Sequence, residues 1–253
     1  MTTYNNINIY SNPYEVALSL SSCLAELACS ASPERRLNIA IPGGNTPQLL
    51  YSLLKSRFGN APWERINFFF TDERLVPVDS PQSNYGQFLR NVGIDAEKKF
   101  NLFPYIYPHN ILRDNATIVE EMSRAKSELL IKIKKNIPFT NNLPNFDYII
   151  LGIGADGHTA SVFVDNLKSF NSNEAIEYVV NPNDGTNRIT LTGSTINNAK
   201  QIIFLCTGAE KSNVVKEVFF QLNTNLPATN VMSAENIKWF IDNDAFAQIK
   251  SNI

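Results

Sequence analysis

Short apolar runs alternate along the chain with longer stretches whose apolar residues recur at helical spacing. Runs of this length are typical of strands that are buried on both faces of a parallel sheet. They occur at residues 37–41, 66–70, 148–151, 201–206 and 237–241. Weaker strand patterns lie at residues 7–10, 101–107, 177–180 and 188–192.

The first amphipathic stretch predicts a helix at residues 13–30, where valine and leucine recur every three to four positions. Thr159 is a candidate N-cap for a helix that follows strand 148–151. Further helices are predicted at residues 48–55, 83–90, 114–135, 194–200, 209–220 and the C-terminal end, with a loop at 136–145 and a turn at 181–187. Alternating strands and helices indicate an α/β fold with a mostly parallel sheet that is flanked by helices on both faces. No repeat or linker interrupts the pattern, so a single domain over residues 1–253 is expected.

Composition narrows the classes of function. The 253 residues are 43% hydrophobic and 18% charged, a normal globular balance, and the net charge is −2. The chain therefore gives no electrostatic case for a nucleic-acid partner, and any anionic ligand must be held by local cations and backbone N–H groups. Three cysteines without close pairing predict no disulfide framework and suit a reducing compartment.

No segment of the sequence is typical of a metal site, a signal peptide or a membrane span. The cysteines have no metal-type spacing to His109 or His158, and His109 is interpreted as a surface histidine. The small apolar stretch at 16–32 carries Glu26 and follows Glu15, with no basic residue before it. No apolar run reaches the length of a membrane span, so a cytoplasmic location is expected.

Unusual residues follow four of the predicted strands. The segments are 42–46 (PGGNT), 71–74 (TDER), 152–158 (GIGADGH) and 207–211 (TGAEK). Ligands of open α/β sheets bind beyond the carboxyl ends of the strands. If all four segments lie at the same edge of the sheet, they form one site.

Two cations are candidates to hold an anion in such a site. Lys211 falls in the first turn of its predicted helix, where the positive end of the dipole disfavours a cation by several tenths of a kcal/mol. A bound anion between the lysine and the helix N–H groups would offset that cost, although a lone lysine can also point to water. Arg188 is the second candidate, because it shares one face of strand 188–192 with Thr190 and Thr192.

His158 is the candidate general base. A position near a helix start disfavours the imidazolium, and an unperturbed histidine titrates near ~6.5. Asp156 is close enough in sequence to orient the ring. The glycines at 152, 154 and 157 also spell the G-x-G-x-x-G pattern of dinucleotide sites, but the next strand does not end in the acidic residue that this reading requires.

These segments together resemble the glucosamine-6-phosphate isomerase/6-phosphogluconolactonase family, and its 6-phosphogluconolactonases in particular. The similarity includes PGGNTP at 42–47, TDER, VP and SNYG across 71–86, LGIGADGHTASVF at 151–163, RITLT at 188–192 and GAEK at 208–211. The resemblance implies a Rossmann-like α/β fold that needs no cofactor. It also implies hydrolysis of 6-phospho-D-glucono-1,5-lactone to 6-phosphogluconate, a step of the pentose phosphate pathway.

The resemblance also implies roles for individual residues. His158 would activate the attacking water, with Asp156 supporting its ring. Arg74 would stabilise charge or contact the lactone. The phosphate would be held by Gly43, Gly44, Thr46, Arg188 and Lys211, together with Asn45 where the family usually has serine.

Two rival functions follow from the same residues. The isomerase branch carries a Glu-Pro shortly after its Asp-Gly-His element, whereas this chain has Phe163, which cannot move protons. Asp72 nevertheless stands where isomerases keep a catalytic acid or base, so an isomerase or deaminase is the first alternative. A non-catalytic sugar-phosphate-binding protein is the second. The expected partner is a small sugar-phosphate lactone, with no membrane and with a monomer or weak homo-oligomer.

Overall fold

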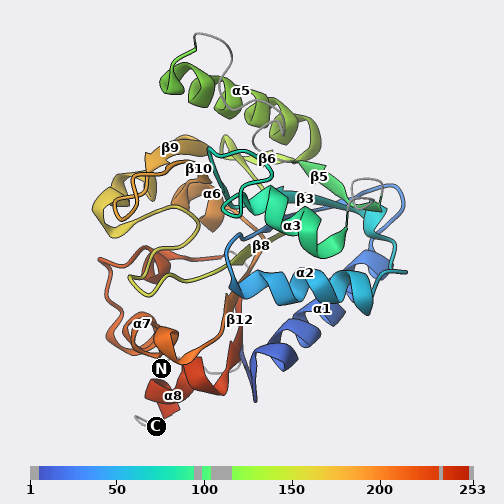
Figure 1. The fold of residues 1–253 in the computed structure, drawn as a ribbon, viewed down its shortest axis with the longest axis vertical. Coiled ribbons are helices and arrows are strands. Elements are labelled where there is room, and N and C mark those ends of the chain that lie inside the picture. Colours follow the sequence, from blue (N-terminus) through green and yellow to red (C-terminus); the bar gives the residue numbers. More distant parts are fainter. Residues whose placement is uncertain (1–5, 94–98, 104–115, 234–235, 251–253) are drawn as a thin grey trace.

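The computed structural model of the chain describes residues 6–93, 99–103, 116–233 and 236–250. Figure 1 shows the fold as a ribbon. Among these residues the main sheet has seven parallel strands in the order β1-β12-β11-β8-β2-β3-β5. The strands are β1 (Ile7–Tyr10), β2 (Leu37–Ile41), β3 (Ile66–Phe70), β5 (Asn101–Phe103), β8 (Tyr148–Leu151), β11 (Gln201–Cys206) and β12 (Asn236–Asp242). The predicted parallel α/β sheet is therefore confirmed.

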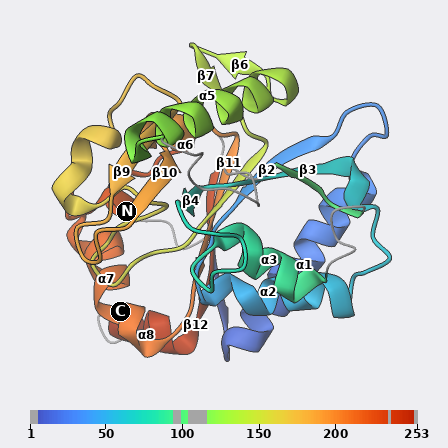
Figure 2. The same cartoon turned by 45° about the horizontal axis from the view of Figure 1, so that its top comes forward.

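Helices flank the main sheet on both sides, as the sequence predicts. In Figure 2, α1 (Pro13–Ser30), α2 (Thr46–Ser56) and α3 (Asn84–Val92) lie together on one side, and α1 contacts α2, which contacts α3. The other side carries α7 (Ser212–Lys216) and a smaller sheet. The remaining α-helices among the described residues are α5 (Ile118–Asn136), α6 (Gly193–Asn197) and α8 (Asn243–Lys250).

The smaller sheet is antiparallel and has the order β4-β10-β9. It consists of β4 (Asp72–Arg74), β9 (Ile176–Val180) and β10 (Asn187–Leu191). The pattern of residues 188–192 predicts the strand but not its partner, because segment 71–74 is too short and too charged to indicate a strand. In the observed register Arg188 pairs with Arg74 and Thr190 with Asp72, so this sheet brings the second strand exit beside Arg188.

Several local predictions need correction or a narrower range. No helix begins at Thr159, which instead forms an isolated bridge with Val162. The helix predicted at 209–220 is divided into the turn η4 (Ala209–Lys211), α7 and the π-type turn η5 (Glu217–Gln221). The predicted loop at 136–145 contains the short hairpin β6 (Phe139–Thr140) and β7 (Leu143–Pro144). Residues 104–107, His109 and the first residues of the helix predicted at 114–135 lie outside the described residues.

The strand β3 shows how the core positions the candidate site. All five of its residues are buried, including Phe68, Phe69 and Phe70, because both faces of the sheet are covered at this strand. Thr71 then donates its backbone N–H to the carbonyl of Ile41 at 2.9 Å, next to the end of β2. The polar residues that follow β3 are thereby fixed at the carboxyl edge of the sheet.

Candidate active site

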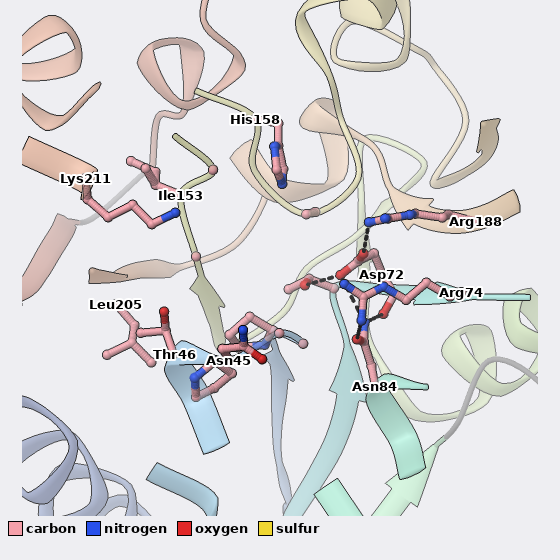
Figure 3. Close-up of a pocket in the computed structure, with 18 residues that line it drawn as sticks. Asn45, Thr46, Asp72, Arg74, Asn84, Ile153, His158, Arg188, Leu205 and Lys211 are labelled. Carbon is pink, nitrogen blue, oxygen red and sulfur yellow. Dashed lines mark hydrogen bonds and ion pairs between the residues drawn. The ribbon is translucent and has the colours of Figure 1, made fainter. Parts of the chain in front are cut away.

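A pocket of about 180 Å³ lies at the carboxyl ends of the main-sheet strands (Figure 3). Its walls come from the segments that follow β2, β3, β8 and β11, so the four strand exits meet at one place. The lining residues include Gly43, Gly44, Asn45, Thr46, Asp72, Arg74, Asn84, His158, Arg188 and Lys211. Of the predicted site residues, only Asp156 is absent from the lining, and it lies directly behind His158.

His158 points its ring into the pocket from the loop after β8 (Figure 3). Its Nδ1 is 2.5 Å from Oδ1 of Asp156, and its backbone N–H donates to the same oxygen at 3.3 Å. The hydrogen bond from His158 lowers the pKa of Asp156 to about 2, so this carboxyl is ionised at neutral pH. An ionised Asp156 favours the tautomer with the proton on Nδ1, which leaves Nε2 as the ring nitrogen that can accept a proton.

The segment that follows His158 is a loop and not the predicted helix. No helix begins at Thr159, so the position of His158 near a helix start is not observed. Thr159 instead donates its hydroxyl to the carbonyl of Gly152 at 2.9 Å, and the backbone N–H of Gly154 donates to the carbonyl of His158 at 2.9 Å. These two bonds close a compact loop, and Asp156 is the group that orients the imidazole.

Asp72 is a buried carboxylate at the edge of the pocket, with 5% of its surface exposed. Its Oδ2 accepts a hydrogen bond from the hydroxyl of Ser161 at 2.5 Å and lies 4.0 Å from Nη1 of Arg188. Its Oδ1 accepts longer bonds from Thr71 Oγ1 and Asn84 Nδ2. Burial lowers the pKa of Arg188, and the negative charge of Asp72 opposes that shift. These contacts hold the side chain of Asp72 between Ser161 and Arg188.

Two guanidinium groups line one side of the pocket. Arg74 donates through Nη1 to the side-chain oxygen of Asn84 and to the carbonyl of Gln82, both at 2.8 Å. Arg188 donates to the carboxylate of Asp184 at 3.3 Å. Both arginines are therefore oriented by protein acceptors before any ligand binds, and both lie on the wall of the pocket opposite Lys211 (Figure 3).

The first loop and Lys211 form the other side of the pocket. Gly44 has a φ of +94°, a conformation that favours glycine, and it lets the chain turn into α2, which begins at Thr46. The N-terminal end of α2 thus meets the pocket, where its N–H groups favour an anion. Lys211 follows β11 and makes no ion pair with any described residue. This side of the pocket is suited to a phosphate.

The sequence did not predict a functional role for three residues that lie at the site. Asn84 lines the pocket, Ser161 bonds Asp72, and the ring of Phe163 packs 5.0 Å from that of His158. The guanidinium of Arg188 also lies 5.6 Å from the centroid of Phe163. For Asn84 and Ser161 the only signal was membership in the SNYG and HTASVF segments, and Phe163 was noted only because it lacks a carboxylate. Ser161 could not be linked to Asp72 from the sequence, because the two residues are 89 positions apart.

The arrangement can perform base-assisted hydrolysis of an anionic substrate. It offers one oriented imidazole, two guanidinium groups and a lysine around one pocket. Within the described residues, no three histidine, cysteine or acidic side chains gather as a group of metal ligands. No helix among these residues is both long and apolar enough to cross a membrane.

Comparison with known proteins identifies the class to which this pocket belongs. The family model described as glucosamine-6-phosphate isomerases/6-phosphogluconolactonase matches residues 11–239. The chain is 34% identical over 240 residues to 6-phosphogluconolactonase 4 of Saccharomyces cerevisiae, covering 90% of each protein. It is 32% identical to 6-phosphogluconolactonase of Haemophilus influenzae, over 83% of this chain and 86% of that protein.

A solved structure shows the same similarity in three dimensions. The crystal structure of devB protein superposes with a TM-score of 0.83 at 27% identity, over 96% of this chain and 99% of that chain. The chain therefore belongs to the glucosamine-6-phosphate isomerase/6-phosphogluconolactonase family.

Proposed function

We propose that the chain is a 6-phosphogluconolactonase, an enzyme that hydrolyses 6-phospho-D-glucono-1,5-lactone to 6-phosphogluconate in the pentose phosphate pathway. Relatives that cover most of the chain carry this name. The observation that carries the proposal is the pairing of His158 with Asp156 at 2.5 Å, in a pocket that is lined by three cationic side chains. That pocket supplies a base together with groups that recognise an anionic lactone.

His158 acts as the general base in the proposed mechanism. Nε2 takes a proton from water, and the hydroxide attacks the lactone carbonyl carbon to give a tetrahedral oxyanion. The carbonyl then re-forms, the bond to the ring oxygen breaks, and that oxygen takes the proton from the imidazolium. Asp156 stabilises the imidazolium, and Arg74 stabilises the oxyanion. Asp72 keeps Arg188 in place by its negative charge.

The phosphate of the substrate is held by cations and by the first loop. Backbone and side-chain donors at the start of α2 come from Gly43, Gly44, Asn45 and Thr46. Lys211 adds positive charge on the same side of the pocket, and Arg188 adds it from the opposite wall. Charge-assisted bonds to a phosphate contribute about 1.5–3 kcal/mol each. Lys211→Ala and Arg188→Ala should therefore chiefly raise KM for the phosphorylated lactone.

Phe163 argues against the isomerase or deaminase alternative. Its ring is 1% exposed and packs on both His158 and Arg188, so the space beside the histidine holds no carboxylate from this position. Asp72 is the observation that favours the alternative, but Ser161 and Arg188 bind its carboxylate. Release of ammonia from glucosamine 6-phosphate would support a deaminase. Binding of sugar phosphates without turnover would support a non-catalytic protein.

The remaining proposals concern the setting of the enzyme. We propose a single domain over residues 1–253, a cytoplasmic location, a small sugar-phosphate lactone as the substrate, and a monomer or weak homo-oligomer. The common pocket supports the first point, because residues from the first loop to the segment after β11 line it together. The net charge of −2 supports the absence of a nucleic-acid partner.

A coupled assay tests the function and the base together. Freshly made 6-phosphogluconolactone is hydrolysed with and without the enzyme, and the spontaneous rate is subtracted. His158→Ala should lower kcat by about 10²-fold or more, while affinity for 6-phosphogluconate changes little. His109→Ala, at the only other histidine, is the control. A wild-type rate equal to the spontaneous rate would contradict the function, and an unchanged kcat in His158→Ala would contradict the base.

A further inference from the structure

The side chain of Asn84 joins two strand exits at the pocket wall. Asn84 begins α3 and is 1% exposed. Its Nδ2 donates to the backbone carbonyl of Asp72 at 2.8 Å, and its Oδ1 accepts from Nη1 of Arg74 at 2.8 Å (Figure 3). One amide group therefore fixes the backbone at Asp72 and the guanidinium of Arg74 at the same time, a task that requires a donor and an acceptor on one side chain.

The same side chain also packs against the first loop. A Cβ added to Gly43 would lie 1.9 Å from Cγ and from Oδ1 of Asn84, so the amide fills the space that a side chain at Gly43 would need. Asn84 thereby contacts the segments that follow both β2 and β3. Asn84 therefore connects Arg74 to the first loop.

A buried carboxylate holds Asn84 itself. Glu73 is 2% exposed, and it accepts hydrogen bonds from the backbone N–H groups of Arg74 at 2.7 Å, Asn84 at 2.8 Å and Tyr85 at 2.8 Å. The two residues that form the Asn84–Arg74 bond are thus tied to one carboxylate through their backbones. The backbones at both ends of the bond are fixed, because neither can shift without breaking a hydrogen bond to Glu73.

We infer that Asn84 is a positioning residue for Arg74 and that it sets the guanidinium where it meets the developing oxyanion. This inference rests on the proposed function. Gln82 also accepts from Nη1 of Arg74, but only through its backbone carbonyl on the solvent-facing side. Loss of the Asn84 amide leaves Arg74 tethered but free to swing away from the pocket. A small displacement of a charge-stabilising group costs catalysis rather than folding.

A double-mutant cycle tests the coupling. Asn84→Ala, Arg74→Ala and the double variant are compared for kcat and KM on the lactone. Asn84→Ala should lower kcat by about tenfold or more in the wild-type background, yet by less than about twofold when Arg74 is already alanine. Asn91→Ala is the matched control, because Asn91 lies on the same helix and bonds only the carbonyl of Gln87 among the described residues. If the alanine variant unfolds, the cycle is repeated with Asn84→Leu, which keeps nearly the size of the side chain but offers no acceptor to Arg74.

The outcomes separate this inference from the proposed function. An equal loss of kcat in both backgrounds, or full activity in Asn84→Ala, would overturn the positioning role. A wild-type protein without turnover would instead contradict the proposed function. In that case the same cycle, measured as affinity for 6-phosphogluconate by calorimetry, still decides whether Asn84 acts through Arg74: coupled losses support it and additive losses overturn it.

Discussion

Gly154 has no side chain, and this leaves the space that His158 and Asp156 occupy. A Cβ on Gly154 would lie 2.1 Å from Nδ1 of His158 and 2.4 Å from Oδ1 of Asp156, which is closer than any stable contact. The requirement is one of space, because the backbone of Gly154 does not adopt a positive φ. The imidazole and the carboxylate therefore pack directly on the main chain at Gly154, and their geometry depends on a glycine at this position.

Gly154→Ala should therefore displace His158 or Asp156. We expect kcat to fall by about tenfold or more, since a small misplacement of a catalytic group is costly, while thermal stability changes less. Steady-state kinetics and thermal melts of the variant measure the two effects. Gly152→Ala is the comparison, because a Cβ there meets no atom within 4 Å. Equal losses of kcat in both variants would argue against the steric explanation.

At the scale of elements, the loop that carries Lys211 is held by β12. Asp242 ends this strand, is 1% exposed, and accepts the backbone N–H of Gly208 through both of its carboxylate oxygens at 3.1 Å. It also accepts the N–H of Ala245 at the start of α8. Gly208 has a φ of +98° and begins the turn that leads to Lys211. The position of Lys211 thus depends on a carboxylate outside the pocket.

Asp242→Ala should raise KM for the phosphorylated lactone by several-fold and leave kcat nearly unchanged, because it loosens an anchor for the phosphate. Loss of the cap on α8 should also cost about 1 kcal/mol of stability. Kinetics with phosphorylated and unphosphorylated lactones show whether the rise in KM concerns the phosphate, and thermal melts measure the loss of stability. In a Lys211→Ala background the change in KM should disappear. Asp244→Ala, on the exposed face of the same helix, is the control.

The elements that the sequence predicts well are those whose pattern is local. Four of the five residues of strand 66–70 are apolar, and all five are buried. The pattern after His158 was misleading, because a threonine hydroxyl can cap a helix or, as Thr159 does, bond the carbonyl of Gly152. Similarly, the charged segment 71–74 becomes a strand only because β10 pairs with it, and that pairing joins residues more than a hundred positions apart.

At the scale of the whole molecule, the location of the site could be predicted, because it follows from the topology of the sheet. Parallel strands place their carboxyl ends on one edge, so the loops that carry Gly43, Arg74, His158 and Lys211 had to converge. The framework behind them was not predictable, because it consists of single hydrogen bonds between distant segments. Ser161 bonding Asp72 across 89 positions is one such case.

The buried carboxyl of Glu73 makes the stability of the whole molecule depend on pH. Burial, with a smaller effect from the charge of Asp72, raises the pKa of Glu73 to about 7 from an ordinary value of 4.5, although hydrogen bonds from three backbone N–H groups favour the ionised form. The folded state therefore binds more protons than the unfolded state between about pH 4.5 and 7. In this window the free energy of unfolding should fall as the pH rises, by about 3 kcal/mol in total from this group.

Urea denaturation of the wild type and of Glu73→Gln at pH 4.5, 5.5, 6.5 and 7.5 measures this contribution. The glutamine does not titrate, so the difference in unfolding free energy between the two proteins isolates the carboxyl. We expect the advantage of the wild type to be largest at pH 4.5, to shrink as the pH rises through 7, and then to stay constant. An advantage that grows with pH would mean that the N–H donors of Arg74, Asn84 and Tyr85 outweigh burial and keep Glu73 ionised in the folded state.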